Sequence, residues 1–303
     1  MNKNITDKVI SKDKMSLFKL YSTFINVNMR YWKVDTISDS SFRTENSGHY
    51  KILGIRNHFP GPALLIMGGI HGEESAGPNM LAQNLEYITK ELSEVPTIIL
   101  PLCNPLGYSK NQRYLESNES NKEGLSAGDA EHFLLNDTLQ NPRINAPSSI
   151  ECDKITRYLL ERDKRQPICF SLNFHEDDGL SKGYIYSQGK YGINDKYAQA
   201  MVKELENIVG IETQGMTRFN QPIINGIVGP VQDGSIDEFL SAKKIFFEGN
   251  IVTGINADTV LTIETPALNI SLDKRIEAQK NIVHRAVQMF KWEYSNIEIN
   301  KHL

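Results

Sequence analysis

The stretch GGIHGEE at residues 68–74 combines glycines with a histidine and two acids, which are residue types that can hold a metal ion. His71 and Glu74 are three residues apart, so at the start of a helix they would lie on one face. Glu73 would lie on another face, and we therefore take Glu74 as the ligand. We expect Gly72 to leave room for an ion and a substrate. Taken alone, a His-x-x-Glu pair also arises by chance in turns.

Two apolar runs further along the chain also end in a residue that could do chemistry. Residues 167–174 lead into His175, and residues 259–263 lead into Glu264. Burying a carboxylate at the end of a strand costs free energy unless the carboxylate is paired with another group or takes part in the function of the protein. The simpler alternative is an acid that faces solvent. Likewise, a single histidine is more often a hydrogen-bonded core residue or a surface residue than a metal ligand. Two histidines and one carboxylate are the usual protein ligands of catalytic zinc, and a further carboxylate can serve as general base.

The elements that must bring these residues together alternate between strands and helices. Apolar runs predict strands near residues 49–55, 62–67, 97–102, 167–174 and 259–264. Helical spacing of apolar residues predicts helices near residues 75–93, 148–162, 197–208 and 271–292. The pattern indicates a single α/β domain with a central mixed, mostly parallel twisted sheet flanked by helices. Ligands of such sheets bind beyond the carboxyl ends of the strands.

Two segments fall outside this alternation. Residues 1–45 are polar and mixed apart from a candidate helix near residues 18–25, and we treat them as an N-terminal extension. Residues 46–303 are then the catalytic domain. Residues 104–146 are rich in Asn, Ser, Gly and Pro with weak periodicity. So long an irregular stretch in a compact domain is usually functional or disordered.

Composition excludes several classes of protein. The 303 residues are 40% hydrophobic and 23% charged, and the net charge is −4, which is ordinary for a soluble globular protein. No basic excess indicates a nucleic-acid or membrane-surface partner. Cys103, Cys152 and Cys169 have no C-x-x-C spacing, which argues against a disulfide framework or a cysteine metal site. Without a signal peptide or a run of roughly 18 apolar residues, we expect a cytoplasmic protein with no membrane span.

Four motifs in order resemble the zinc carboxypeptidase superfamily, whose members include acylases of the aspartoacylase and succinylglutamate desuccinylase type. The motifs are His71-Gly-Glu-Glu74, Asn104-Pro-Leu-Gly-Tyr108, His175 and Thr262-Ile-Glu-Thr-Pro266. They cover residues from about 50 to 292, and together they are far more specific than any one alone. The resemblance implies a zinc carboxypeptidase-like fold. It also implies one zinc ion per chain, held by His71, Glu74 and His175.

The resemblance further implies roles for individual residues. Glu264 would act as general base and acid through the zinc-bound water. Arg113 would polarise the scissile carbonyl and stabilise the oxyanion. The segment Gly234-Ser-Ile-Asp237 is similar to one that lines the specificity pocket of carboxypeptidases, so Ile236 would face the substrate side chain. The implied substrate is a small peptide or an acylated amino acid.

Two positions depart from the family pattern. The family usually has Asp-x-Asn-Arg, whose Asn and Arg hold the substrate carboxylate, but this chain has Asp129-Ala-Glu131-His132. The carboxypeptidase tyrosine upstream of Gly-Ser-Ile-Asp also has no match, because Ile227-Val-Gly229 occupies that region. Loss of a bidentate arginine indicates an unusual substrate, with Glu131 and His132 as candidate binding residues and Glu131 suited to a cationic group. Three arginines are alternative residues to hold the substrate carboxylate, as a clamp, although no motif supports them: Arg56, Arg143 and Arg218.

The leading interpretation is a zinc-dependent amide hydrolase of the metallocarboxypeptidase type with an atypical substrate. An N-acyl amino acid deacylase is the alternative enzyme. Acylases commonly carry a C-terminal β-rich domain, whereas here about 39 residues follow Glu264 and they predict a helix, which favours the peptidase. A non-catalytic binder of zinc or peptide is a third interpretation. The absence of the family's carboxylate-binding Asn and Arg favours it, whereas the presence of Glu264 as a candidate base argues against it. Another divalent metal in place of zinc also stays open.

Overall fold

Ten strands form one mixed sheet in the computed structural model, which describes residues 14–40, 50–114 and 128–301. The described residues form twelve strands in all: β1 (Trp32–Ser40), β2 (Tyr50–Asn57), β3 (Ala63–Gly68), β4 (Thr97–Leu100), β5 (Ile168–Asp177), β6 (Tyr184–Ser187), β7 (Gln214–Met216), β8 (Pro222–Ile224), β9 (Ile227–Val228), β10 (Lys244–Phe247), β11 (Asn250–Thr253) and β12 (Thr259–Pro266). Their order across the sheet is β1-β2-β4-β3-β5-β12-β6-β9-β8-β7, and β10 and β11 pair separately as a hairpin.

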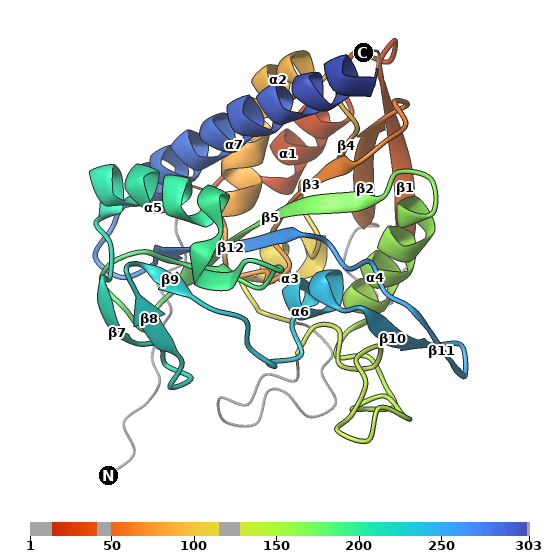
Figure 1. Cartoon of the computed structure of the whole chain (residues 1–303). Coiled ribbons are helices and arrows are strands. Elements are labelled where there is room, and N and C mark those ends of the chain that lie inside the picture. Colours follow the sequence, from red (N-terminus) through yellow and green to blue (C-terminus); the bar gives the residue numbers. More distant parts are fainter. Residues whose placement is uncertain (1–13, 41–49, 115–127, 302–303) are drawn as a thin grey trace.

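Helices cover both faces of this sheet (Figure 1). One face carries α1 (Leu17–Phe24), α2 (Ala76–Glu91), α5 (Lys196–Val209) and α7 (Leu272–Lys301), and the 3-10 helix η1 (Gly192–Asn194) precedes α5. The other face carries α4 (Ile150–Asp163) and α6 (Ile236–Ser241), together with the β10–β11 hairpin. The short helix α3 (Pro105–Lys110) contacts β2, and its Tyr108 packs into the core on the side of α1 and α2. The α/β fold with a mixed sheet between helix layers confirms the prediction from sequence. The sheet is less parallel than expected, because four of its nine strand pairs are parallel and five are antiparallel.

The parallel part of the sheet lies at its centre. Strands β4, β3, β5 and β12 run parallel to one another, whereas β1, β2 and β4 pair antiparallel, as do β12 and β6. The central strands are buried along nearly their whole length because helices shield both faces. Parallel strands end at the same edge, so the carboxyl ends of β3, β5 and β12 are brought side by side.

Alternation along the central strands decides which residues face which helix layer. Leu172 and Phe174 of β5, and Ile263 of β12, pack into the core shared with α2, α5 and α7. Because successive side chains of a strand point to opposite faces, His175 and Glu264 lie on the other face. There the core contains residues of α4 and α6. The two predicted site residues therefore share one face of the sheet.

The described part of the predicted N-terminal extension joins the same sheet. Helix α1 confirms the predicted helix near residues 18–25, and it buries Leu20 and Phe24 against α2. Strand β1 pairs antiparallel with β2 and forms an edge of the sheet. The boundary at residue 45 stays a prediction. Residues 1–13 of the extension and residues 115–127 of the predicted irregular stretch lie outside the described residues.

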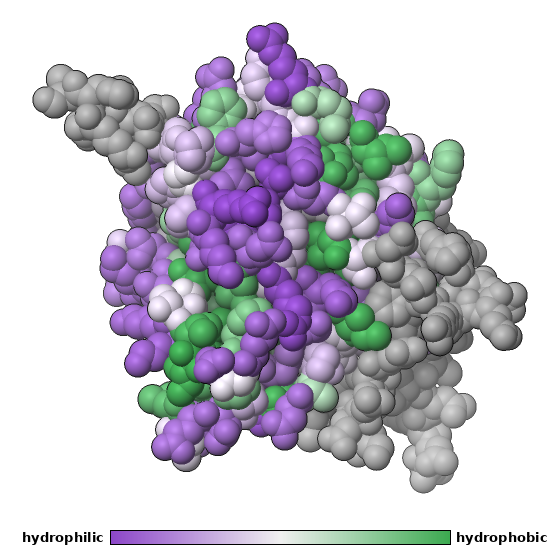
Figure 2. Space-filling model, turned by 90° about the vertical axis from the view of Figure 1, so that its right-hand side faces the viewer, coloured by the Kyte–Doolittle hydropathy of each residue, from purple (hydrophilic) through white to green (hydrophobic). Residues whose placement is uncertain are grey.

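The surface is ordinary for a globular chain. Figure 2 shows a largely hydrophilic face, on which apolar side chains form small groups separated by polar ones. None of the described helices combines the length and the hydropathy that a membrane span requires. The three cysteines are free thiols, and Cys103 and Cys152 are buried.

Candidate active site

The His-x-x-Glu pair lies in a turn between β3 and α2. Strand β3 ends at Gly68 and helix α2 begins at Ala76, so the expectation that the pair lies on a helix is wrong. The backbone N–H of Glu74 donates to the carbonyl oxygen of His71 at 3.3 Å, which closes the turn. His71 Nδ1 consequently lies 2.8 Å from Glu74 Oε1. Gly69 helps the chain to leave the strand, since its φ of +65° is one that L side chains rarely adopt.

Gly72 lets this turn pack against the backbone of α3. A Cβ atom there would clash with backbone atoms of Gly107 and Gln112, so Gly72 does not leave room for an ion as expected. Asn104 caps α3 by accepting the N–H of Gly107 at 2.8 Å, and its Nδ2 donates to the carbonyl of Arg113 at 2.7 Å. The N–H of Gly72 donates to the same carbonyl at 3.3 Å. The Asn-Pro-Leu-Gly motif therefore positions the backbone of Arg113 beside the metal-binding turn.

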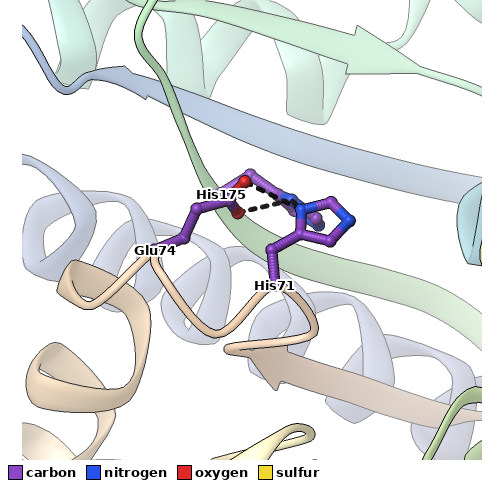
Figure 3. Close-up of side chains that lie close together, drawn as sticks. All are labelled: His71, Glu74 and His175. Atoms are coloured by element: carbon purple, nitrogen blue, oxygen red, sulfur yellow. Dashed lines mark hydrogen bonds and ion pairs between the residues drawn. The ribbon is translucent and has the colours of Figure 1, made fainter. Parts of the chain in front are cut away.

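His175 completes a buried cluster with the His-x-x-Glu pair (Figure 3). Its Nδ1 lies 2.8 Å from Glu74 Oε2 and 3.1 Å from His71 Nδ1. All three candidate ligand atoms lie within 4.8 Å of one another. Ligand atoms about 2.1 Å from a tetrahedral zinc ion are about 3.4 Å apart, so both the spacing and the donor types fit such an ion. The three residues form a candidate metal site.

The charges in the cluster also suit a cation. Burial would raise the pKa of the Glu74 carboxyl, but the neighbouring positive charges of His71 and His175 hold it well below its usual value. Conversely, burial would lower the pKa of His175, but the Glu74 carboxylate raises it to about 10. The buried carboxylate thus draws positive charge onto both imidazoles. A divalent cation would supply the same charge and displace their protons.

Glu264 lies beside the cluster on the neighbouring strand. It is the register partner of His175 in the parallel pair β12–β5 and of Tyr184 in the antiparallel pair β12–β6. Burial raises the pKa of Glu264 to about 8, against the opposing effect of the positive charge on His175. A carboxyl group with a pKa near neutrality can both accept and release a proton.

A cavity of about 310 Å³ joins these residues. His71, Glu74, His175, Arg113 and Glu264 all line it, so the structure brings the predicted ligands and catalytic residues together. Arg113 Nη1 lies 3.6 Å from Glu74 Oε1. The volume is at the lower end of the range of small-molecule sites, roughly 300–1,000 Å³.

Glu131 and His132, the predicted substrate-binding residues, do not line this cavity. The N–H of Ala130 donates to the carbonyl of Gly234 at 2.8 Å and holds the segment against the start of α6. The Glu131 side chain packs over Gly234, and His132 Nε2 lies 3.5 Å from Asp153 of α4. The structure therefore does not bring these two residues to the cavity, and their contact with substrate stays a prediction.

Ile236 also lies away from the cavity. It is the first residue of α6 and is fully buried in the core with residues of α4. Its neighbours Ser235 and Asp237 line the cavity instead. The segment named by the resemblance thus reaches the cavity, but the start of the helix turns Ile236 into the core and Asp237 toward the cavity.

Asp129 is a site residue that the sequence analysis did not assign. Its Oδ1 lies 3.4 Å from His71 Nε2, and it accepts a hydrogen bond from the Tyr114 hydroxyl. A carboxylate beside the second ring nitrogen orients a metal-binding histidine. The signal was present in the sequence, because Asp129 occupies the first position of the match to Asp-x-Asn-Arg.

Of the three arginines considered as alternative clamps, Arg218 lines the cavity and the other two do not. Arg56 pairs with Asp35 of β1 at 2.6 Å. Arg143 forms two hydrogen bonds with Glu238 of α6, at 2.8 and 2.5 Å. These two arginines stabilise the packing of the chain.

Comparison with known proteins agrees with this geometry. The profile of the succinylglutamate desuccinylase/aspartoacylase catalytic domain matches residues 60–192, which contain both histidines of the cluster. Among curated proteins, none is similar enough in sequence to match the chain.

Solved structures share the fold at low sequence identity. A candidate metallopeptidase from Shewanella amazonensis is 23% identical with a TM-score of 0.67, and the match covers 89% of this chain and 92% of that one. A metallo-carboxypeptidase from Burkholderia cenocepacia is 11% identical with a TM-score of 0.55, covering 91% and 68% of the two chains. Bovine thrombin-activatable fibrinolysis inhibitor is 16% identical with a TM-score of 0.53, covering 91% and 98%.

Proposed function

From the profile match over residues 60–192 and the fold shared with metallopeptidase structures, we propose that this chain is a zinc-dependent amide hydrolase of the zinc carboxypeptidase type with Glu264 as general base. The observation that carries the proposal is the pairing of Glu264 with His175 on adjacent parallel strands. The pairing places a carboxyl group at the wall of the cavity that the candidate metal ligands also line. A base at the metal site is what hydrolysis requires and what a simple metal binder does not need.

His71, Glu74 and His175 are the residues that would hold the metal ion. When bound, zinc supplies a Lewis acid that polarises an amide carbonyl and acidifies water. Asp129 fixes the ring of His71 from its other nitrogen. All three proposed ligands are buried, which limits competition from bulk water.

The remaining chemistry belongs to Glu264 and Arg113. Glu264 accepts a proton from the attacking water and delivers it to the leaving nitrogen. Arg113 donates hydrogen bonds to the carbonyl oxygen as negative charge develops there. A well-placed donor of this kind contributes roughly 3 kcal/mol to stabilisation of the transition state.

The substrate is an amide, and two classes are favoured by different observations. A peptide-like substrate is favoured by the shared fold with the Burkholderia metallo-carboxypeptidase. An N-acyl amino acid is favoured by the profile match to the desuccinylase and aspartoacylase domain. Both reactions use the same residues, so the difference lies in what the rest of the cavity binds.

A substrate panel tests the proposal. Zinc-loaded protein is offered short peptides and N-acyl amino acids, and release of free amine is measured. Turnover on one class identifies the enzyme as a peptidase or a deacylase. Binding without turnover on every member of both classes would identify a non-catalytic binder and overturn the proposal.

A further inference from the structure

We propose that the turn between β7 and β8 is the part of the site that binds an anionic group of the substrate, with Arg218 as the binding residue. The inference builds on the proposed function and specifies its substrate as a small amide that carries a carboxylate. Arg218 and Phe219 of this turn line the same cavity as the metal cluster and Glu264. Among the described residues that line the cavity, the other basic ones are the two histidines of the metal cluster and Arg113 beside it.

The turn is held in place by its own hydrogen bonds. The buried Thr217 accepts the N–H groups of Phe219 and Gln221 with its Oγ1, at 3.2 and 3.3 Å. Its own N–H donates to the carbonyl of Gln221 at 2.9 Å. The hydroxyl of Tyr186, on β6, donates to Gln221 Oε1 at 2.7 Å and ties the turn to the sheet. Arg218 is therefore presented from a fixed backbone.

The Arg218 guanidinium has hydrogen-bonding capacity to spare. Its side chain is 41% exposed, and Nη1 donates to Asp178 Oδ1 at 2.8 Å. That is its one hydrogen bond among the described residues, whereas a guanidinium has five N–H donors. Exposed ion pairs of this kind contribute little stability, so a substrate carboxylate can compete for the guanidinium. Arg113, by contrast, lies against Glu74 at the reacting end of the cavity.

The nearest buried acid, Asp177, helps to position Arg218. Both oxygens of Asp177 are occupied, Oδ1 by the N–H of Gly179 at 2.8 Å and Oδ2 by the Tyr184 hydroxyl at 2.7 Å. Asp177 Oδ1 also lies 3.9 Å from Arg218 Nε. Asp233 is the competing feature, because this carboxylate also lines the cavity, where it accepts the N–H of Ser235 at 3.0 Å. A site organised around Asp233 would select a cationic substrate instead.

The test compares matched substrates and matched arginines. Each amide that the enzyme hydrolyses is prepared with a free carboxylate and as the carboxamide. Arg157 is the control, because it is 42% exposed, donates to Asp153 at 2.8 Å, and lies outside the cavity. We expect Arg218→Gln to lower kcat/KM for the carboxylate by about 10- to 100-fold, through KM, and to leave the carboxamide unchanged. Arg157→Gln should change neither.

A binding measurement separates failure of this inference from failure of the proposed function. If no amide is hydrolysed, the proposed function fails, and calorimetry of the zinc-loaded protein with glutarate and glutaramide tests Arg218 alone. Weaker binding of glutarate, but not glutaramide, to Arg218→Gln supports the inference. Equal binding of glutarate by the wild type and Arg218→Gln overturns it. A preference for cationic substrates that Asp233→Asn removes also overturns it.

Discussion

Glu264 of β12 and His175 of β5 are direct register partners in the parallel centre of the sheet. Their side chains project from the same face at neighbouring positions, because both strands are fixed by cores on either side. A slip of one residue in either strand would move one of them to the opposite face. The sheet therefore determines how the proposed base and the proposed ligand lie relative to each other.

Replacing Glu264 by Gln should abolish turnover while leaving the metal site intact. The amide keeps the size of the side chain but cannot accept a proton from water, and loss of a general base typically lowers kcat by about 10²- to 10⁴-fold. Steady-state kinetics and elemental analysis of the same preparation measure the two effects. Near-normal kcat in Glu264→Gln would refute the assignment.

Replacing His71 by Ala should remove the metal, because His71 supplies one of the three candidate ligand atoms. His132 provides a matched control, since the two side chains are similarly buried at 6% and 7% exposure and His132 lies outside the cavity. Zinc per chain is measured by elemental analysis after dialysis. Stoichiometric zinc in His71→Ala, or equal loss in His132→Ala, would contradict the ligand set.

Much of the fold could be predicted from sequence because the central strands are buried on both faces. Continuous apolar runs such as those of β3, β5 and β12 are typical of parallel strands that helices cover on both faces. Strand β1 was missed because it is an edge strand with an irregularity between Thr36 and Ser38, and such strands lack a continuous apolar run. The short strands β6 to β9 are two to four residues long, too short for a clear period.

In the site, the residues that could be located from sequence lie at strand ends, and those that could not lie in loops. His175 and Glu264 could be located because an apolar run leads directly to each. The position of Glu131 outside the cavity could not be foreseen, because it depends on the hydrogen bond between Ala130 and Gly234, which are far apart in sequence. Arg218 could not be singled out, since nothing in its local sequence indicates that the turn between β7 and β8 lies at the cavity.

Replacing Gly72 by Ala should destabilise the protein and weaken metal binding together. The added Cβ would meet backbone atoms of Gly107 and Gln112, which cannot rotate away as a side chain can. Overpacking of this kind costs about 1–3 kcal/mol in unfolding free energy. Gly229→Ala is the control, because its Cβ would make only an ordinary contact, 3.6 Å from Ile193. Chemical denaturation compares the two, and equal effects would contradict the packing role of Gly72.

Replacing Asp129 by Asn should weaken zinc binding without removing it. The amide keeps the shape of the side chain but loses the charge that faces His71 Nε2 at 3.4 Å. Loss of such a partner typically lowers metal affinity about 10- to 100-fold. Competition with a chelator of known affinity measures the change. An unaltered zinc affinity would mean that Asp129 serves Tyr114 and the packing of its loop rather than the metal site.

Replacing Arg275 by Met should destabilise the fold, and the loss should grow as pH rises. Glu176 is buried, forms an ion pair with Arg275, and accepts the N–H of Ala76 at 2.9 Å. Burial raises the pKa of Glu176 and Arg275 opposes that rise, so the pKa should rise further in the variant.

The sign of the pH effect follows from that rise. When the pKa of an acid is higher in the folded protein than in the unfolded chain, the free energy of unfolding falls as pH rises from the unfolded pKa through the folded pKa. Above that range Glu176 must be charged without its partner, and breaking a buried pair in this way costs about 3–5 kcal/mol. Unfolding free energies at about pH 5 and about pH 8 measure the trend, with Arg157→Met as an exposed control expected to lose at most about 1 kcal/mol at either pH. A deficit in Arg275→Met that is the same at both pH values would show that Glu176 does not depend on Arg275 for its charge.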